Sequence, residues 1–435
     1  MAVGVRIRSA EEIQAALGER AVGHVRAATA DDAVAGVQAQ VVVEPTTEDE
    51  VAAVLSYADA EGLKVLVRGG GTQLGMGYPP TGGDILLSTR GLDKLVEHEP
   101  GDMTATAEAG MTLADFQTTL GRAGQWLALD PALPAATTIG GVVATAVSGA
   151  HRLRYGGVRD QIIGVRIVRA DGTIAKGGGK VVKNVAGFDL PKLFTGSLGT
   201  LGVIVSATFR LYPRAASART VLLHTASFGP LCDLAVKLLN TTLVPSALTI
   251  GGSTSTADSV LAMRFEGSVA AADAQAAEVG AFAGGLGGTA EILTGDQEAD
   301  YWRAAMAGPV VAADAGVMIR LKASLLPSTI HPWLNTLRDR ATRLAVQGVW
   351  CAHAGHGLVD LRFTGEPAAL RAIVADLRAA AVAHGGSLVV TDAPPAVLAV
   401  VDPWGASPAL AIMRRVKAQF DPHATLNPGR FVGGI

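Results

Sequence analysis

The chain has 435 residues, of which 49% are hydrophobic and 17% charged, and its formal net charge is −3. This length predicts two or three domains with a substantial core, and the apolar content excludes an intrinsically disordered chain. The slightly negative charge argues against a nucleic-acid-binding surface.

Cysteine usage and hydropathy narrow the class further. Cys232 and Cys351 are far apart and form no Cys-x-x-Cys pair, so neither a disulfide framework nor an iron–sulfur or zinc site is encoded. The first residues contain no apolar signal-peptide core, and no apolar run approaches the ~18 residues of a membrane span. We therefore expect a cytoplasmic protein without direct membrane insertion, held to a membrane at most through partner chains.

The first expected elements lead to a glycine run. Residues 9–17 have a helical pattern, and residues 41–43 read as a strand. A capping-box pattern at Thr47 then begins a helix that ends at Gly62, and residues 65–67 predict a second strand. This βαβ unit would deliver the glycines that follow at the carboxyl edge of its second strand.

Gly69, Gly70 and Gly71 form that run. Without Cβ atoms, consecutive backbone N–H groups can converge on one anion, which predicts a diphosphate cradle. A nicotinamide-type Rossmann turn would need a helix directly after the glycines, and the Gly and Pro residues over 75–83 exclude one. A glycine-rich hairpin would show the same run, so the run alone leaves both interpretations open.

Two further glycine-dense passages follow. Residues 84–130 alternate short strands with one helix at 112–123, and residues 137–145 then predict a second glycine turn among small side chains. Residues 162–168 and 173–175 flank Asp171-Gly172, which predicts a hairpin. Residues 177–189 form the third glycine-rich passage, and Gly196 to Ile204 lead into a strand ending at Tyr212-Pro213. Three such loops in one domain suggest one extended ligand threaded between them.

The composition changes near residue 215. Alanine-rich helices, including 270–282 and 367–383, alternate there with short strands. Residues 408–420 predict an amphipathic helix. Its expected inward residues are Leu410, Met413, Val416 and Phe420, and its expected outward residues are Arg414, Arg415 and Lys417.

Five motifs, in order, resemble those of FAD-binding PCMH-type (vanillyl-alcohol-oxidase-like) flavoproteins. They are Arg68 to Thr72, Asp130-Pro131 with Ile139 to Gly141, Tyr155 to Gly157 with Arg159-Asp160, Gly199 to Ile204, and Asn427 to Arg430. Within that superfamily, residues 183–190 and the ending from Phe420 to Arg430 are similar to the glycolate oxidase FAD-binding subunit family, GlcE.

The resemblance implies an α+β fold with α/β elements: a PCMH-type, two-subdomain FAD-binding region and an α+β cap domain. The expected parts are an N-terminal brace (1–36), the FAD-binding domain (37–214), the substrate or cap domain (215–405) and a C-terminal segment returning to the FAD domain (406–435). The resemblance also implies that the backbone of the glycine loop binds the pyrophosphate of FAD and that the residues beyond this loop line the adenosine and flavin. It further implies that residues near the C-terminus lie close to the flavin. The cofactor-binding residues so implied are Arg68, Gly69, Gly70, Gly71, Thr72, Gln73, Leu74, Thr138, Ile139, Gly140, Gly141, Thr145, Gly156, Gly202, Val203, Ile204, Asn427 and Arg430.

Two features of this site depart from, or add to, the family pattern. Relatives that attach FAD covalently often use a His where this chain has Gly71-Thr72, so we expect dissociable FAD. Arg68 precedes the cradle, and either a role as a charge for the cofactor or a structural ion pair is consistent with the sequence.

Most of the candidate catalytic residues belong to the segment 351–362. Oxidation of a 2-hydroxy acid by a flavin needs a base for the hydroxyl proton and a cation for the carboxylate. His353, His356 and Arg362 supply these types, and Arg320 is a second cation. If the segment is extended, His356 and Arg362 share one face and His353 lies on the other.

The same segment is loosely similar to a histidine strand of metal-assisted D-2-hydroxy-acid dehydrogenases. Those proteins carry a Glu-His-Gly-x-Gly segment downstream, whereas residues 385–392 contain no glutamate or histidine. We therefore expect no bound metal.

The resemblance supports three functional hypotheses. The first is an FAD-dependent dehydrogenase or oxidase subunit that acts on a small 2-hydroxy acid of the glycolate and D-lactate class. It would work beside a second flavoprotein subunit and an iron–sulfur subunit. The second is a non-catalytic or electron-relay FAD-binding subunit of such a complex, and the third is an aldonolactone or alcohol oxidase with a different cap.

Overall fold

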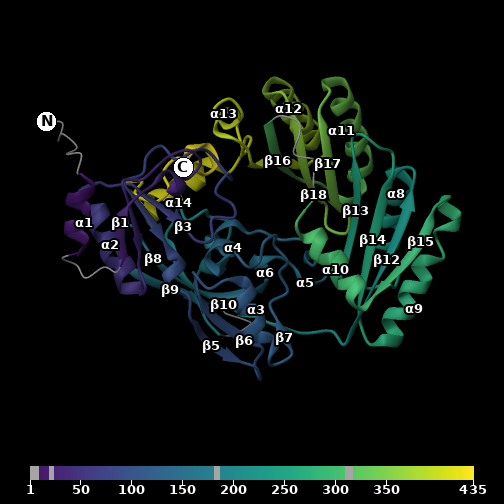
Figure 1. Ribbon diagram of the computed structural model, residues 1–435, viewed down its shortest axis with the longest axis horizontal. Helices are drawn as coiled ribbons and strands as arrows, with labels where there is room; N and C mark the ends of the chain where they lie inside the picture. The colour runs from purple at the N-terminus through teal and green to yellow at the C-terminus, as the bar shows by residue number, and fades with distance from the viewer. Residues whose placement is uncertain (1–8, 19–23, 181–186, 309–316) are drawn as a thin grey trace.

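The computed structural model describes residues 9–18, 24–180, 187–308 and 317–435. Strands β1 to β11 belong to the first half of the chain, and β12 to β19 form one large sheet in the second half (Figure 1). The predicted α+β class is confirmed, and the second half of the chain forms a separate sheet with its own helices. Residues 183–186, on which part of the GlcE resemblance depends, lie outside the described residues.

A four-stranded sheet forms the first subdomain. Its order is β1-β2-β4-β3, with β2, β4 and β3 parallel and β1 antiparallel. The strands are β1 (His24–Ala27), β2 (Val41–Glu44), β3 (Val65–Arg68) and β4 (Ile85–Ser88). The expected βαβ unit is present, but β4 inserts between its two strands.

Local sequence explains the two helices of this subdomain. Helix α1 (Ala10–Gly18) buries Ile13 and Leu17. Helix α2 (Glu48–Glu61) begins where the Thr47 hydroxyl accepts the N–H of Glu50, and it ends at Gly62 in the left-handed conformation. The chain therefore reaches β3, and the glycine run after it, in a fixed direction.

A five-stranded antiparallel sheet, ordered β5-β6-β10-β8-β9, forms the second subdomain. The expected hairpin joins β8 to β9 through a turn in which Gly172 has a φ of +83°. The strands are β5 (Leu95–Glu99), β6 (Thr104–Glu108), β8 (Ile162–Val168), β9 (Ile174–Gly178) and β10 (Val203–Arg210), and β7 (Gln125–Trp126) pairs with β11 (Tyr212–Pro213). The helices are α3 (Leu113–Gly121), α4 (Ile139–Thr145), α5 (Arg152–Tyr155), α6 (Val158–Gln161) and α7 (Leu190–Phe194).

An antiparallel eight-stranded sheet, ordered β15-β12-β14-β13-β17-β18-β16-β19, forms the cap. One face packs against helices α8, α9, α11 and α12, whereas α10 lies on the side that faces the first domain (Figure 1). The strands are β12 (Ser217–Thr225), β13 (Ala247–Ser253), β14 (Ser259–Gly267), β15 (Thr289–Thr294), β16 (Val317–Ser324), β17 (Gln347–His353), β18 (Leu358–Gly365) and β19 (Ser387–Asp392). The helices are α8 (Phe228–Leu238), α9 (Val269–Gly280), α10 (Gly295–Met306), α11 (Ile330–Leu344) and α12 (Pro367–Ala383).

The C-terminal segment runs back to the first subdomain. After α13 (Pro395–Leu398) and α14 (Leu410–Phe420), the backbone of residues 425–427 lies along β3. The N–H of Val65 donates to the Thr425 carbonyl, and the N–H of Asn427 donates to the Val65 carbonyl. Residues remote in sequence thus flank the glycine run.

Short 3-10 turns occur at η1 (Ala30–Asp32), η2 (Thr89–Gly91), η3 (Gly284–Leu286), η4 (Pro327–Thr329) and η5 (Val432–Gly434).

Lys417 corrects one expectation about α14. We predicted it to point outward, but its side chain is buried. Its ammonium group donates to Asp421 Oδ2 at 2.5 Å and to the carbonyls of Thr200 and Leu426. A buried Lys is tolerated here because an opposite charge and two carbonyls replace its water. In the part of the chain that the structure describes, no helix has the length and hydropathy to cross a bilayer.

Candidate active site

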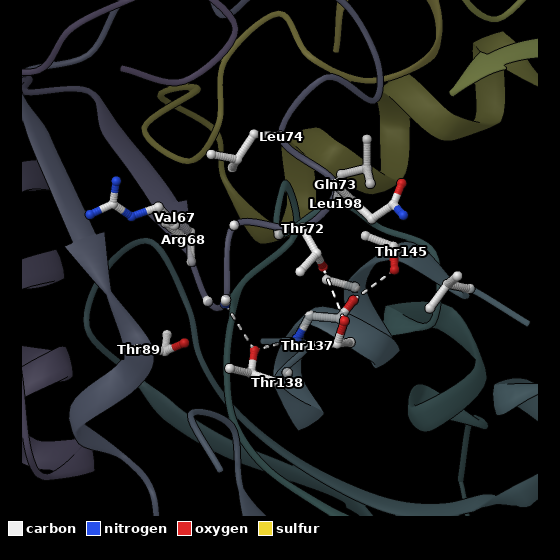
Figure 2. Close-up of a pocket in the computed structure, with 18 of the residues that line it drawn as sticks. Val67, Arg68, Thr72, Gln73, Leu74, Thr89, Thr137, Thr138, Thr145 and Leu198 are labelled. Carbon is white, nitrogen blue, oxygen red and sulfur yellow. Dashed lines mark hydrogen bonds between the residues drawn. The ribbon is translucent and has the colours of Figure 1, made fainter. Parts of the chain in front are cut away.

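A pocket of about 850 Å³, called here the cradle pocket, lies where the glycine loop, α4 and the C-terminal segment meet (Figure 2). The residues from the expected set that line it are Arg68, Gly69, Gly70, Gly71, Thr72, Gln73, Leu74, Thr138, Gly140, Gly141, Thr145, Ile204, Asn427 and Arg430. Segments from four separate parts of the sequence therefore converge on one pocket.

The loop after β3 presents unused hydrogen-bond donors to this pocket. The N–H groups of Gly71, Thr72, Gln73 and Leu74 donate to no described residue. The Gly70 N–H donates to the Thr138 hydroxyl at 3.3 Å, which fixes the loop against the neighbouring segment (Figure 2). Consecutive N–H groups without protein acceptors form an anion-binding concavity. The loop thus fits a diphosphate.

The glycines are required by packing as well as by ligand approach. A Cβ on Gly70 would lie 1.7 Å from the Ala136 carbonyl oxygen, and one on Gly69 would lie 2.3 Å from the Thr138 hydroxyl oxygen. Gly71 has a φ of +77°, a conformation that side chains rarely adopt. The glycine run therefore allows the loop to pass directly beside residues 136–138.

The second glycine passage is a helix rather than the turn we expected. The Thr138 hydroxyl accepts the N–H of Gly141 and begins α4, and the Thr145 hydroxyl donates to the Gly141 carbonyl at 2.7 Å. Gly140 is needed because a Cβ there would lie 2.8 Å from the Ala109 side chain. The small residues therefore allow helix packing, and they still leave Gly140 and Gly141 on the pocket wall.

Four expected cofactor residues lie outside the cradle pocket. Ile139 and Val203 are fully buried in hydrophobic cores. Gly202 packs against Phe194, and Gly156 lies in the turn between α5 and α6. Motif position alone did not distinguish packing residues from lining residues.

Sequence reasoning also missed residues that line this pocket. Pro131 and Gly199 lay within recognised motifs and could have been included. Val67, Thr137, Ala144 and Leu198 also lie within the strand and glycine passages that the sequence predicted. Thr89, Ala132 and Val147 reach the pocket only through tertiary structure, so no local pattern marks them.

Arg68 forms a structural ion pair. Its guanidinium points away from the threonines of the pocket (Figure 2) and donates to Asp32 at 2.9 Å. Asp32 also accepts two hydrogen bonds from Arg26, and chiefly these hold the pKa of the Asp32 carboxyl well below its ordinary value. Of the two roles that the sequence allowed for Arg68, the structure favours the ion pair.

Two residues of the C-terminal segment complete the pocket. Asn427 accepts the N–H of Val67 and donates to the Leu198 carbonyl, so it joins β3 to the 198–199 turn. The Arg430 guanidinium donates to the carbonyls of Leu74 and Met76 and pairs with no carboxylate among the described residues. Burial lowers the pKa of Arg430 to about 10, so it stays charged at neutral pH. A buried positive charge beside free N–H groups again favours an anionic ligand.

A second pocket of about 1220 Å³, called here the cap pocket, adjoins the first. Both are lined by Gln73, Pro131, Ala132, Thr145 and Val147. The cap side of this pocket comes mainly from the sheet face that lacks the α8, α9, α11 and α12 layer, and its ionisable and thiol residues are Arg320, Lys322, Cys351, His353, Asp360 and Arg362. A ligand in the cap pocket would therefore lie next to the cradle pocket.

Arg320 and Arg362 form a cationic pair in the cap pocket. They are directly opposite each other on β16 and β18, an arrangement that destabilises a sheet unless an anion offsets it. Arg362 makes no ion pair with a described residue, and its pKa is lowered by burial and by Arg320. Among the described residues, the ion-pair partner of Arg320 is Asp392, whose Oδ2 lies 3.7 Å from Arg320 Nε. The pair is suited to hold a carboxylate.

The two histidines lie side by side because residues 347–365 form a hairpin. The sequence placed His353 and His356 on opposite faces only if the segment is extended, and that condition is not met: the chain turns between β17 and β18 with Gly357 at a φ of +81°. The rings stack with centroids 5.2 Å apart, and His353 Nε2 lies 2.9 Å from Asp360 Oδ2. His353 lines the cap pocket, whereas His356 does not, and both ring nitrogens of His356 are buried. Among the described residues, no three His, Cys, Asp or Glu side chains are placed to share a metal ion.

The protonation of His356 leads to a stability prediction. Burial, followed by the nearby His353 and Arg152, lowers the pKa of His356 to about 3. In the unfolded chain its pKa is ordinary, near 6.5, so below that pH the unfolded state binds a proton that the folded state does not. Stability from this group is therefore present above pH 6.5 and lost as the pH falls toward 3. Between pH 7 and pH 5, the thermal unfolding midpoint should therefore fall less for His356→Gln than for the parent protein.

The matched control for that measurement is His24→Gln, at an exposed histidine of β1. It should keep the parental pH dependence. Equal pH dependence in the parent and His356→Gln would show that His356 titrates normally.

Comparisons with known proteins agree with this geometry. Residues 39–178 match the FAD binding domain family, and residues 214–390 with 405–431 match the C-terminal domain of FAD linked oxidases. The chain is 26% identical over 417 residues to glycolate oxidase subunit GlcD of Bacillus subtilis, covering 89% of this chain and 88% of that protein. It is 40% identical over 174 residues to D-lactate dehydrogenase of Archaeoglobus fulgidus, covering 40% of this chain and 39% of that protein.

The fold is also shared with a solved structure. The 4-ethylphenol oxidase of Gulosibacter chungangensis superposes with a TM-score of 0.73 at 14% identity, covering 98% of both chains. FAD fits the cradle pocket, where free N–H groups and the Arg430 charge suit its diphosphate. The chain is therefore an FAD-dependent oxidoreductase, with one region that matches the FAD binding domain family and a second that matches the C-terminal domain of FAD linked oxidases.

Proposed function

We propose that this protein oxidises a small 2-hydroxy acid of the glycolate and D-lactate class. One observation carries the proposal: the Arg320–Arg362 pair and the His353–Asp360 pair share a pocket that adjoins the FAD cradle. A cation pair for a carboxylate and a base for a hydroxyl proton are the two groups that this oxidation requires. The names of the relatives, glycolate oxidase subunit GlcD and D-lactate dehydrogenase, support the same substrate class.

Different residues of the cap pocket would bind the substrate carboxylate and remove the hydroxyl proton. Arg362, with a buried Nε that has no acceptor, would bind the substrate carboxylate, and Arg320 would add a second donor. His353 Nε2 faces the Asp360 carboxylate, which places the ring proton on Nε2 and leaves Nδ1 as an acceptor. The His353 ring lines the cap pocket and would take the hydroxyl proton of a substrate bound there. Asp360 would then stabilise the imidazolium that forms.

FAD, when bound, supplies the acceptor for the two electrons that leave the α-carbon. The walls shared by the two pockets would hold the substrate α-carbon beside the cofactor. We further propose that the electrons pass on to a partner chain or carrier, as in a complex with a second flavoprotein and an iron–sulfur subunit. That part, and the narrower assignment to the GlcE family, rest on the sequence resemblance.

An anaerobic reduction assay tests the proposal. The purified holoprotein is mixed with glycolate or D-lactate, and the flavin absorbance near 450 nm is followed together with formation of the 2-keto acid. We expect bleaching with one keto acid per FAD, and loss of bleaching in His353→Gln with FAD content unchanged. A yellow protein that stays oxidised with both substrates would instead support the electron-relay interpretation.

The mode of FAD attachment gives a second, simpler prediction. No His, Cys or Tyr lines the cradle pocket among the described residues. Thr72 lies where the family resemblance implies a histidine in proteins with covalently attached FAD. Trichloroacetic acid precipitation should therefore release the flavin into the supernatant. Yellow colour that remains in the pellet would show a covalent bond.

A further inference from the structure

A buried ion pair between Lys417 and Asp421 joins two segments that contribute to the wall of the cradle pocket. The exposed fraction of the side chain is 9% for Lys417 and 0% for Asp421. The Lys417 ammonium donates to Asp421 Oδ2 at 2.5 Å. It also donates to the carbonyls of Thr200 at 2.8 Å and Leu426 at 3.0 Å. An ammonium has three donors, so each of them has an acceptor here.

Asp421 fixes the turn that follows α14. Its Oδ1 accepts the N–H of Thr425 and its Oδ2 accepts the N–H of Leu426, both at 2.8 Å. Beyond this turn, the backbone of residues 425–427 pairs with β3, the strand that leads into the glycine loop. A buried carboxylate that accepts two backbone N–H groups and an ammonium restrains the turn strongly. Asp421 therefore sets the direction in which the chain continues along β3.

The Thr200 carbonyl belongs to a turn that forms another part of the pocket wall. Leu198 and Gly199 of this turn line the pocket. The Leu198 carbonyl accepts the side-chain amide of Asn427 at 2.7 Å, and the Leu198 N–H donates to a carbonyl of α4 at 2.8 Å. A Cβ on Gly199 would lie 2.9 Å from Asn427 Nδ2, so the turn packs directly against the C-terminal segment. Lys417 and Asn427 thus make two separate links between this turn and that segment.

We propose that Lys417 and Asp421 are positioning residues for FAD. Neither of them lines the cradle pocket, but the segment that they hold carries Asn427 and Arg430 into it. The Arg430 guanidinium donates to two carbonyls of the loop that follows the glycines, and its charge suits a diphosphate. The role concerns cofactor binding, so it is independent of the substrate that is oxidised in the cap pocket.

Loss of the Lys417 ammonium would separate the two segments. Thr200 and Leu426 are buried, and no second donor to their carbonyls occurs among the described residues. Without Lys417, both carbonyls would lack a donor and Asp421 would lack a positive partner, which is costly in the interior of a protein. The carbonyls could regain hydrogen bonds only by admitting water between the segments. Such a separation would move Arg430 away from the diphosphate site.

Flavin binding to the Lys417→Met apoprotein tests this role. In fluorescence titrations, the FAD dissociation constant should rise at least about 10-fold and that of riboflavin should change by less than about 3-fold, because riboflavin lacks the diphosphate. The matched control is Lys192→Met, which removes an exposed lysine of α7 that pairs with Asp189 and should bind both flavins like the parent. Parental FAD affinity in Lys417→Met, or an equal loss of affinity for both flavins, would overturn the proposal.

A double-mutant cycle shows whether Lys417 acts through Arg430. Lys417→Met should raise the FAD dissociation constant by less than about 3-fold in an Arg430→Met background, because the charge that Lys417 helps to position is already absent. If the effects of the two substitutions on the binding free energy are fully additive, Lys417 does not position Arg430 and the proposal fails.

Hydrogen exchange in the parent protein tests the same role without any substitution, so it still applies if Lys417→Met does not fold. Coupling between two sites is reciprocal. FAD should therefore slow exchange of the Thr425 and Leu426 amides, whose N–H groups donate to Asp421. This slowing should exceed that of amides in β12 and β14 of the cap by at least about 10-fold. Equal slowing in both regions would refute the proposed coupling.

Discussion

Replacing Gly70 with valine is expected to abolish FAD binding. A Cβ at this position would lie 1.7 Å from the Ala136 carbonyl oxygen, which is backbone and cannot rotate away. The loop must therefore move off residues 136–138, and residues 71–74, whose N–H groups have no acceptor among the described residues, would be displaced from the pocket wall. We expect the FAD dissociation constant to rise by at least about 100-fold, or roughly 2.7 kcal/mol, in fluorescence titrations of the apoprotein.

Gly82→Val is the matched control for this experiment. Gly82 lies in the same glycine- and proline-rich stretch, and a Cβ there would make only an ordinary contact with Lys64 at 3.7 Å. The control should bind FAD like the parent protein. Parental FAD affinity in Gly70→Val, with a normal unfolding midpoint, would contradict the account of the loop.

Replacing Arg362 with methionine is expected to remove activity toward 2-hydroxy acids while leaving FAD in place. The substitution keeps an apolar stem but deletes a guanidinium that has no carboxylate partner among the described residues. Loss of one partner from a buried, charge-assisted contact costs about 2–5 kcal/mol. The measured quantity is the rate constant for flavin reduction divided by the substrate dissociation constant, and it should fall by roughly 30- to 4,000-fold. Because Arg320 no longer faces a like charge, the protein itself should not be destabilised.

Arg343→Met provides the control for loss of an arginine. Arg343 is an exposed residue of α11 that pairs with Asp376, and it does not line the cap pocket. Its substitution should leave stopped-flow reduction unchanged. Equal reduction rates for Arg362→Met and the parent would show that the carboxylate binds elsewhere.

The parts of the fold that could be predicted from sequence are those fixed by neighbouring residues. Thr47 and Gly62 mark both ends of α2 because a hydroxyl cap and a left-handed glycine act locally. Asp171-Gly172 marks the β8–β9 hairpin for the same reason. The glycine run could be placed at the end of β3, since the apolar strand and the glycines adjoin each other in the chain.

The misjudged features depend on contacts between distant residues. Gly140 and Gly141 suggested a turn, but Thr138 caps a helix whose glycines pack against Ala109. Lys417 was assigned to the outer face of α14, although Asp421 and the Thr200 carbonyl hold it inside. Insertion of β4 between β2 and β3 likewise follows from sheet assembly rather than from local pattern.

In the candidate active site, too, the residue types could be predicted from sequence, whereas their arrangement depends on contacts between distant residues. Residue types in 351–362 were enough to nominate His353, His356 and Arg362. Their arrangement required the turn at Gly357, which brings the histidines together and separates His356 from the cap pocket. The pairing of Arg320 with Arg362 depends on the register of β16 and β18, and no spacing in the sequence specifies it.

Reconstitution of the apoprotein with flavins tests the central claim most directly. Fluorescence titrations with FAD and with riboflavin would compare a ligand that carries a diphosphate with one that lacks it. We expect one FAD per chain, bound at least about 100-fold more tightly than riboflavin, because the N–H groups of residues 71–74 and the Arg430 charge act on the diphosphate. A chain that remains colourless with FAD, or that binds riboflavin equally well, would contradict the account.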